Sequence, residues 1–150
     1  MWSGTTPLAD IHIGATVFTQ GIAFNPDDLN PNANKQSQTR SASGKGKHFG
    51  IVLEKTATGI IVAGTATFNG STTIVGQVKT QSEPFWIPVV PATKEGGITH
   101  DPVSRSAGDA TKHKWINIRT KHTIPGTAFK LTPEAYPASV VATIKTALGM

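Results

Sequence analysis

Short runs of apolar and β-branched residues, rather than long helical stripes, dominate the middle of the chain. Phe49–Leu53 and Ile60–Thr67 are two such runs, and Glu54–Gly59 joins them with a glycine at its end. Runs of this length bounded by turn residues are typical of strands. Ile60–Ala63 is apolar at every position, which predicts a strand buried on both faces. The pattern therefore predicts a central hairpin around which the rest of the chain is organised.

Further strands are expected on both sides of this hairpin. Ile11–Phe18 predicts a first strand with a bend at Gly14, and Thr72–Val78 predicts another after the hairpin. Phe85–Val90 contains and adjoins prolines, which donate no ladder hydrogen bond, so it predicts an edge strand. The last two expected strands are the alternating segment Lys114–Thr120, with one polar face, and a short strand within His122–Lys130.

The helical pattern lies at the C-terminal end, where an apolar stripe at helical spacing predicts a helix over residues 138–148. Thr132-Pro133-Glu134 has the residues of a helix start: a capping threonine, a first-turn proline and an acid. Pro137 would remove a hydrogen bond inside such a helix. Two alternatives follow: the helix kinks at Pro137, or it begins near Pro137 after a tight turn.

Polar, proline- and glycine-rich sequence separates these elements. Residues 1–10 predict a loose N-terminal tail, and residues 20–47 predict a long polar loop. A chain of 150 residues that is 37% hydrophobic favours a single domain, 1–150. The order of elements predicts a mainly β fold, a small and strongly bent antiparallel β-barrel with a C-terminal α-helix packed on it.

Composition excludes several classes of site. The chain has no cysteine, which rules out disulfides, thiolate metal sites and cysteine nucleophiles and fits a reducing compartment such as the cytoplasm. The five histidines show no metal-ligand spacing, so neither a metal nor another cofactor is expected. No apolar run approaches the ~20 residues that span a membrane, so no membrane partner is expected. The formal charge of +5 permits an anionic partner such as RNA.

The polar segment before the hairpin carries the first group of candidate site residues. Arg40, Lys45 and Lys47 lie there without an acid between them, so we expect the strongest positive potential and contacts to RNA phosphates. His48 follows, and imidazole suits proton transfer because its ordinary pKa is about 6.5. The alternative for His48 is a loop-edge histidine that faces water.

Two further candidates lie in predicted strands. Arg119 is either a bidentate phosphate clamp or the structural partner of an acid such as Glu54. Trp86, next to Phe85, is either a platform on which an RNA base stacks or part of the barrel core.

Three segments in this order resemble the MazF/PemK family of toxin endoribonucleases. They are a basic loop that enters an apolar strand, Lys47–Leu53; an apolar strand that ends in threonines, Ile60–Thr67; and Ile118-Arg119-Thr120, followed by the closing helix. Together the order and rough spacing of these segments cover residues 14–149.

The resemblance implies an SH3-like barrel, metal-independent RNA cleavage, a homodimer paired through its barrels and an inhibitor protein as a further partner. It implies catalytic roles for His48, Thr65 and Arg119, with Thr67 as the other register of the threonine. Where the family usually has Arg-Pro, this chain has His48-Phe49, so the family's arginine has no counterpart. The alternatives are a non-catalytic module on the same barrel that binds a protein or peptide, and a structural or storage protein without a site.

Overall fold

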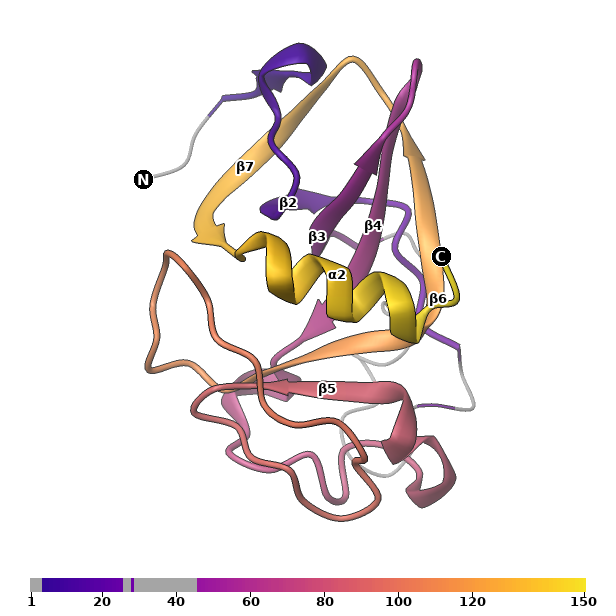
Figure 1. Cartoon of the computed structure of the whole chain (residues 1–150), viewed down its shortest axis with the longest axis vertical. Helices are drawn as coiled ribbons and strands as arrows, with labels where there is room; N and C mark the ends of the chain where they lie inside the picture. The colour runs from indigo at the N-terminus through magenta and orange to yellow at the C-terminus, as the bar shows by residue number, and fades with distance from the viewer. Residues whose placement is uncertain (1–3, 26–27, 29–45) are drawn as a thin grey trace.

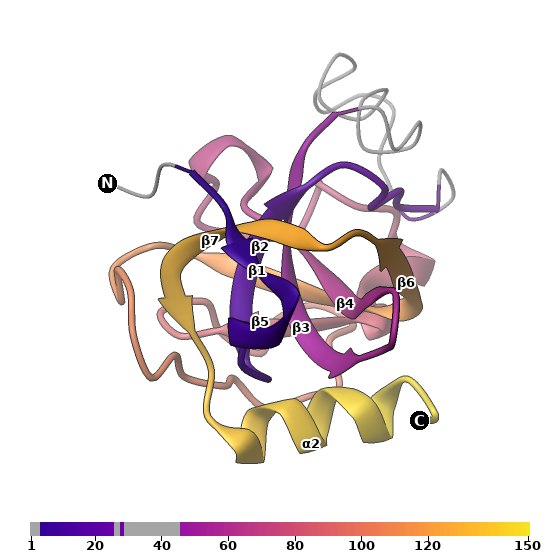
Figure 2. The ribbon, with the colours of Figure 1, turned by 90° about the horizontal axis from the view of Figure 1, so that it is seen from above.

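A bent antiparallel sheet with one α-helix against it forms the framework (Figures 1 and 2). The computed structural model describes residues 4–25, 28 and 46–150. Across these residues the strand order is β1-β7-β2-β3-β4-β6-β5. The strands are β1 (Thr6–Pro7), β2 (Ala15–Thr19), β3 (His48–Lys55), β4 (Gly59–Ala66), β5 (Trp86–Val89), β6 (Lys114–Pro125) and β7 (Ala128–Ala135). The helices are the 3₁₀ turns η1 (Leu8–Asp10), η3 (Phe68–Gly70) and η4 (Thr80–Phe85) and the α-helix α2 (Ala138–Ala147).

The prediction of a mainly β fold with a C-terminal helix is confirmed, whereas the closed barrel is not formed. Within the described residues, β1 and β5 are the two edges of the sheet and do not pair with each other. Register shifts between β2 and β7, between β3 and β4, and between β4 and β6 mark irregularities that bend the sheet. The bend gives the sheet a curved cross-section (Figure 2).

The central hairpin is the expected pair β3–β4, and side chains cover it on both faces. Val62 and Ala63 are neighbours on β4 that point to opposite faces, and both are fully buried. Helix α2 covers one face through Val140, Val141 and Ile144, which belong to one apolar cluster with residues of β3 and β6. A second cluster on the opposite face is built around the aromatic rings of Phe24, Trp86 and Trp115.

Two segments expected to be loops are part of the packed structure. Thr6 pairs with Phe129, and the Leu8 amide donates to the Thr127 carbonyl at 2.8 Å, so residues 6–10 are tied to β7 rather than loose. Ile22 and Phe24, from the predicted polar loop 20–47, are buried in the aromatic cluster. They approach this closely because Gly50 and Gly64 pair across β3 and β4, where a Cβ atom would lie 2.8 Å from the Ile22 side chain.

Two strand predictions need correction. Residues 72–78 contain only an isolated bridge between Val75 and Val78. The Glu95 carboxylate holds this segment as a loop by accepting hydrogen bonds from the Thr73 hydroxyl (2.7 Å) and the Ile74 amide (2.8 Å). The segment 114–120 does not have one polar face, because β6 is buried on both faces from Lys114 to Ile118.

The sequence around Thr132 forms the end of β7, so α2 begins at Ala138 directly after Pro137. Of the two alternatives, the later start is therefore the observed one. The local signals of a helix start are overridden because β7 pairs with β2, as between Leu131 and Val17. In the described part of the chain, no helix has the length and apolar character needed to cross a membrane.

Strand β5 is an edge strand, as its prolines predicted, and the segment around Val103 lies along its outer side. Val89 and Val103 form a parallel bridge. The Val103 amide donates to the Pro88 carbonyl, and the Val90 amide donates to the Val103 carbonyl, both at 2.9 Å. The end of this edge is therefore hydrogen-bonded to a loop of the same chain.

Gly59→Ala tests the close contact between β4 and β6. A Cβ atom at this position would meet the Ile124 carbonyl oxygen and lie 2.9 Å from the Pro125 Cα atom, and neither backbone atom can move without disturbing the ladder. We expect a loss of about 1–3 kcal/mol in the free energy of unfolding, typical of overpacking. Thr58→Ala, at an exposed neighbouring position, is the control and should change stability by less than about 0.5 kcal/mol in urea titrations. Equal stability of Gly59→Ala and the wild type would contradict this packing.

Candidate functional site

The three predicted catalytic residues lie in different surroundings. Thr65 is 2% exposed, and its hydroxyl donates to the Phe49 carbonyl oxygen at 3.4 Å, so it is a core residue. The Arg119 Nη1 atom is 2.6 Å from the Oδ1 atom of buried Asp28, and its guanidinium lies 4.8 Å above the Phe85 ring. Arg119 thus has the structural ion pair that one alternative proposed, with Asp28 rather than Glu54 as the acid.

Of the predicted RNA-binding residues, Arg40 and Lys45 lie outside the described residues. The Lys47 ammonium is 5.9 Å from the centre of the Phe18 ring. Trp86 is fully buried, with its ring 5.6 Å from that of Phe24 and 5.5 Å from that of Phe68. A base cannot stack on Trp86 while this core is intact, so the prediction of a stacking platform is corrected to a core residue.

His48 begins β3, on the same face of the sheet as His122, a histidine that the sequence did not single out. Its ring is 5.6 Å from that of Phe24, on the face of the sheet that carries the aromatic cluster. His122 is 9% exposed, and burial lowers its pKa below the ordinary value, with repulsion from His48 as a further cause. The sequence predicted that one strand ends at Thr120 and that another lies within His122–Lys130, whereas β6 runs through His122 as one strand. The position of His122 was therefore not predicted.

A cleft of about 800 Å³ opens where β3 begins, β4 ends and β6 begins. Its lining includes three consecutive basic residues, Lys112, His113 and Lys114, and the ring of Phe49. Four threonines, Thr67, Thr72, Thr111 and Thr132, also line it. The resemblance allowed either Thr65 or Thr67 as the counterpart of the family's threonine. Of these two, Thr67 lines the cleft, whereas Thr65 is buried in the core.

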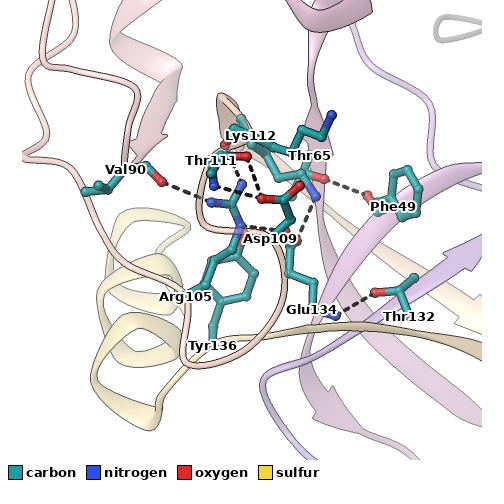
Figure 3. A network of polar contacts seen from close by, with 11 residues as sticks. Phe49, Thr65, Val90, Arg105, Asp109, Thr111, Lys112, Thr132, Glu134 and Tyr136 are labelled. Atoms are coloured by element: carbon teal, nitrogen blue, oxygen red, sulfur yellow. Dashed lines mark hydrogen bonds and ion pairs between the residues drawn. The ribbon is translucent and has the colours of Figure 1, made fainter.

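A buried carboxylate forms one wall of this cleft (Figure 3). Glu134 Oε1 lies 2.6 Å from Arg105 Nε, and Oε2 lies 2.7 Å from Lys114 Nζ and accepts the Tyr136 hydroxyl at 3.1 Å. The three charged side chains are only 2–13% exposed. Each carboxylate oxygen therefore has charged or hydroxyl donors in place of the water that it lost.

Arg105 extends this network to Lys112, another residue of the cleft lining. It donates to the Val90 carbonyl oxygen at 3.0 Å and to the Lys112 carbonyl oxygen at 2.7 Å. The Asp109 carboxylate, also in this lining, accepts hydrogen bonds from the Thr111 amide (2.9 Å) and hydroxyl (2.6 Å). The loop that presents residues 111–113 is thus fixed to the buried ion pairs (Figure 3).

The electrostatics of the network follow from burial and charge. Burial alone would raise the pKa of Glu134, but the charges of Lys114 and Arg105 and their hydrogen bonds outweigh it and hold the pKa below its usual range. Burial lowers the pKa of Lys114, which Glu134 opposes. Burial raises the pKa of the Tyr136 phenol, which keeps the hydroxyl a donor at neutral pH. Among the described residues, no group of three or more His, Cys, Asp or Glu side chains could hold a metal ion.

The cleft was not predicted from the sequence, although one of the segments that form it carried a visible signal. Glu134 carried the signature of a helix start, so its role as the buried partner of Arg105 and Lys114 had no local signal. The tripeptide Lys112-His113-Lys114, directly before an apolar strand, was a visible signal of the same kind as Lys45–His48.

Glu134→Gln tests how much the ion network contributes. The amide keeps the shape of the side chain but leaves Arg105 and Lys114 as buried cations without an anion, which typically costs about 3–5 kcal/mol. The matched control is Glu54→Gln, whose partner Lys145 is 2.9 Å away at the surface, where such a pair is worth roughly 0–1 kcal/mol. Similar free energies of unfolding for the two variants in urea titrations would contradict a central role of Glu134.

The lowered pKa of His122 predicts that the folded protein loses stability in mild acid. The unfolded chain binds a proton at this residue near pH 6.5, whereas its lowered pKa delays protonation of the folded chain, so stability falls as the pH drops below about 6.5. We expect the melting temperature to fall less between pH 7.5 and 5.5 in His122→Gln than in the wild type or in His12→Gln, which changes an exposed histidine. The contribution of Glu134 is lost at lower pH than that of His122. Its carboxyl pKa is lowered in the folded protein, so the stabilisation is complete above the pKa of the unfolded chain and is lost as the pH falls through the folded pKa. The same pH dependence in all three proteins would count against His122.

Comparison with known proteins gives no relative for this chain: no family model matches it, and neither does any curated protein or solved structure. The resemblance to the MazF/PemK family therefore rests on the sequence segments that carry it. The function has to be inferred from the chemistry of the cleft.

Proposed function

We propose that the chain binds single-stranded RNA in the cleft at residues 112–114 and cleaves it without a metal ion. One observation carries this proposal: three consecutive basic residues and four threonines line a cleft of about 800 Å³. A cavity of this size accommodates a small part of a nucleic-acid strand rather than a duplex.

The lining has the chemistry that phosphodiesters require. Lysine is a point charge that binds phosphate without a fixed geometry, and hydroxyl groups donate to phosphate and ribose oxygens. Lys112 is exposed at the wall of the cleft, whereas Lys114 is buried beside Glu134. The two lysines therefore differ in role: Lys112 contacts the ligand from the rim, and Lys114 holds the wall in place through its ion pair with Glu134.

The position of the cleft agrees with the segments that resemble MazF/PemK. Phe49 belongs to the basic entrance of the first hairpin strand, and Thr67 belongs to the threonine end of the second. Both line the cleft. This agreement supports an RNA-directed activity at the same place, with Thr67 rather than Thr65 as the threonine that contacts the ligand.

The resemblance also supports a homodimer, an inhibitor protein and a cytoplasmic location, which remain proposals. A second candidate function is a non-catalytic module that binds a peptide in the same cleft. It is favoured by Asp109 and Glu134, which add negative charge to the lining and suit a ligand of mixed charge better than a uniform polyanion. RNA and peptide binding are distinguished by the salt dependence of affinity.

Lys112→Ala tests RNA binding at the cleft. The variant keeps the backbone carbonyl that Arg105 uses, so the wall remains anchored while one cation is lost. In fluorescence anisotropy with a labelled single-stranded RNA, we expect weaker binding and a slope of log affinity against log salt that falls by about one.

The control is Lys121→Ala, on the same strand β6 but outside the cleft lining, which should bind RNA as the wild type does. Equal affinities and salt slopes for the two variants would place RNA binding elsewhere. Failure of the wild type to bind RNA, together with salt-insensitive binding of peptides, would favour the second candidate.

A further inference from the structure

We infer that His113, rather than His48, is the residue that transfers the proton in RNA cleavage at this cleft. The inference rests on the proposed function and adds to it the identity of a catalytic residue. It follows from the position of the five histidines, all of which lie in the described part of the chain.

His113 is the histidine that lines the cleft. Its side chain is half-buried, so the imidazole is open to a ligand on one side. His48 and His122 lie instead on the face of the sheet that carries the aromatic cluster, where His122 is almost fully buried.

The backbone on both sides of His113 is anchored, which fixes where the imidazole can reach. Before it, the Lys112 carbonyl oxygen accepts a hydrogen bond from Arg105 Nη2 at 2.7 Å. After it, Lys114 begins β6 and is held by Glu134. The imidazole ring also lies 6.3 Å from that of Trp115, which is fully buried. A catalytic group held by a rigid element needs little reorganisation when the ligand binds.

The charged groups around the imidazole suit a reaction that builds negative charge on phosphorus. Lys112 and Lys114 flank His113 in the chain, and Asp109 and Glu134 line the same cleft. The Glu134 charge is balanced by Arg105 and Lys114. Lys112 therefore remains on the exposed wall as the cation next to an approaching phosphate.

The step is an internal transesterification. The neutral imidazole of His113 takes the proton of a ribose 2′-hydroxyl while the 2′ oxygen forms a bond to phosphorus. The bond from phosphorus to the 5′ oxygen breaks, and this oxygen takes a proton from water. The imidazolium then returns its proton to the hydroxide that remains. The products are a 2′,3′-cyclic phosphate and a 5′-hydroxyl end, and no oxidant, reductant or metal takes part.

The test compares the wild type with His113→Gln, His48→Gln and His12→Gln, each purified in the same way and assayed in EDTA. The substrate is an end-labelled single-stranded RNA, and DNA of the same sequence serves as the uncleavable ligand. Cleavage rates are measured from pH 5 to 9, and binding is measured by anisotropy. The thermal unfolding of each variant shows whether it is folded.

We expect His113→Gln to lose about 10²–10⁴-fold in cleavage rate, the usual contribution of a general base. It should also lose the pH dependence that a general base gives to the cleavage rate. RNA affinity and melting temperature should stay close to those of the wild type, since the neighbouring lysines and the Arg105 contact are retained. His12→Gln and His48→Gln should keep both the rate and the pH profile.

Two results would overturn the inference while the proposed function stands. One is a His113→Gln variant that cleaves RNA with the rate and pH profile of the wild type. The other is loss of cleavage in His48→Gln with its fold intact. A wild-type protein that binds RNA but leaves it uncut removes the cleavage activity and the role of His113 together. A wild-type protein that binds no RNA removes the proposed function itself.

Discussion

The buried Glu134 carboxylate is the interaction on which both the fold and the cleft depend. Its donors come from three places in the chain: Arg105 in the long loop after β5, Lys114 at the start of β6, and Tyr136 just beyond β7. Charges removed from water are tolerated only when each has a partner in good geometry. The three segments can therefore take their positions only together, and the cleft between them is formed as a consequence of folding rather than by the ligand.

This arrangement separates structural charge from charge that is accessible to solvent. Arg105 and Lys114 form ion pairs with Glu134, and Arg119 forms an ion pair with Asp28. Lys112 and His113 lie on a wall that the same network holds in place. A wall of this kind is rigid because its support is buried, while Lys112 and His113 keep part of their surface accessible to solvent.

The elements that were read correctly from the sequence are those specified by local pattern. The apolar runs of the hairpin, the prolines of β5 and the stripe of α2 each identify their element without knowledge of a partner. The helix start predicted at Thr132-Pro133-Glu134 was wrong. The same residues are compatible with a helix start and with the end of a strand, and pairing with β2 selects the strand. The ion pair of Arg119 could not be read either, because Asp28 is 91 positions away in the chain. The family resemblance implied Thr65, and the resemblance together with imidazole chemistry implied His48. Thr67 and His113 are far apart in the chain, and only the folded structure places both in the lining of one cleft.

The edges of the sheet have a consequence for how copies of the protein meet in concentrated solution. An open edge strand is a template for strand addition and hence for aggregation. At one end of the sheet, the Val103 backbone is hydrogen-bonded to the Pro88 carbonyl and the Val90 amide at the end of β5. Pro88 itself has no amide hydrogen to donate. At the other end, β1 is only two residues long, and the second is Pro7. Each of the two edge strands is therefore a poor template for a continuous intermolecular ladder.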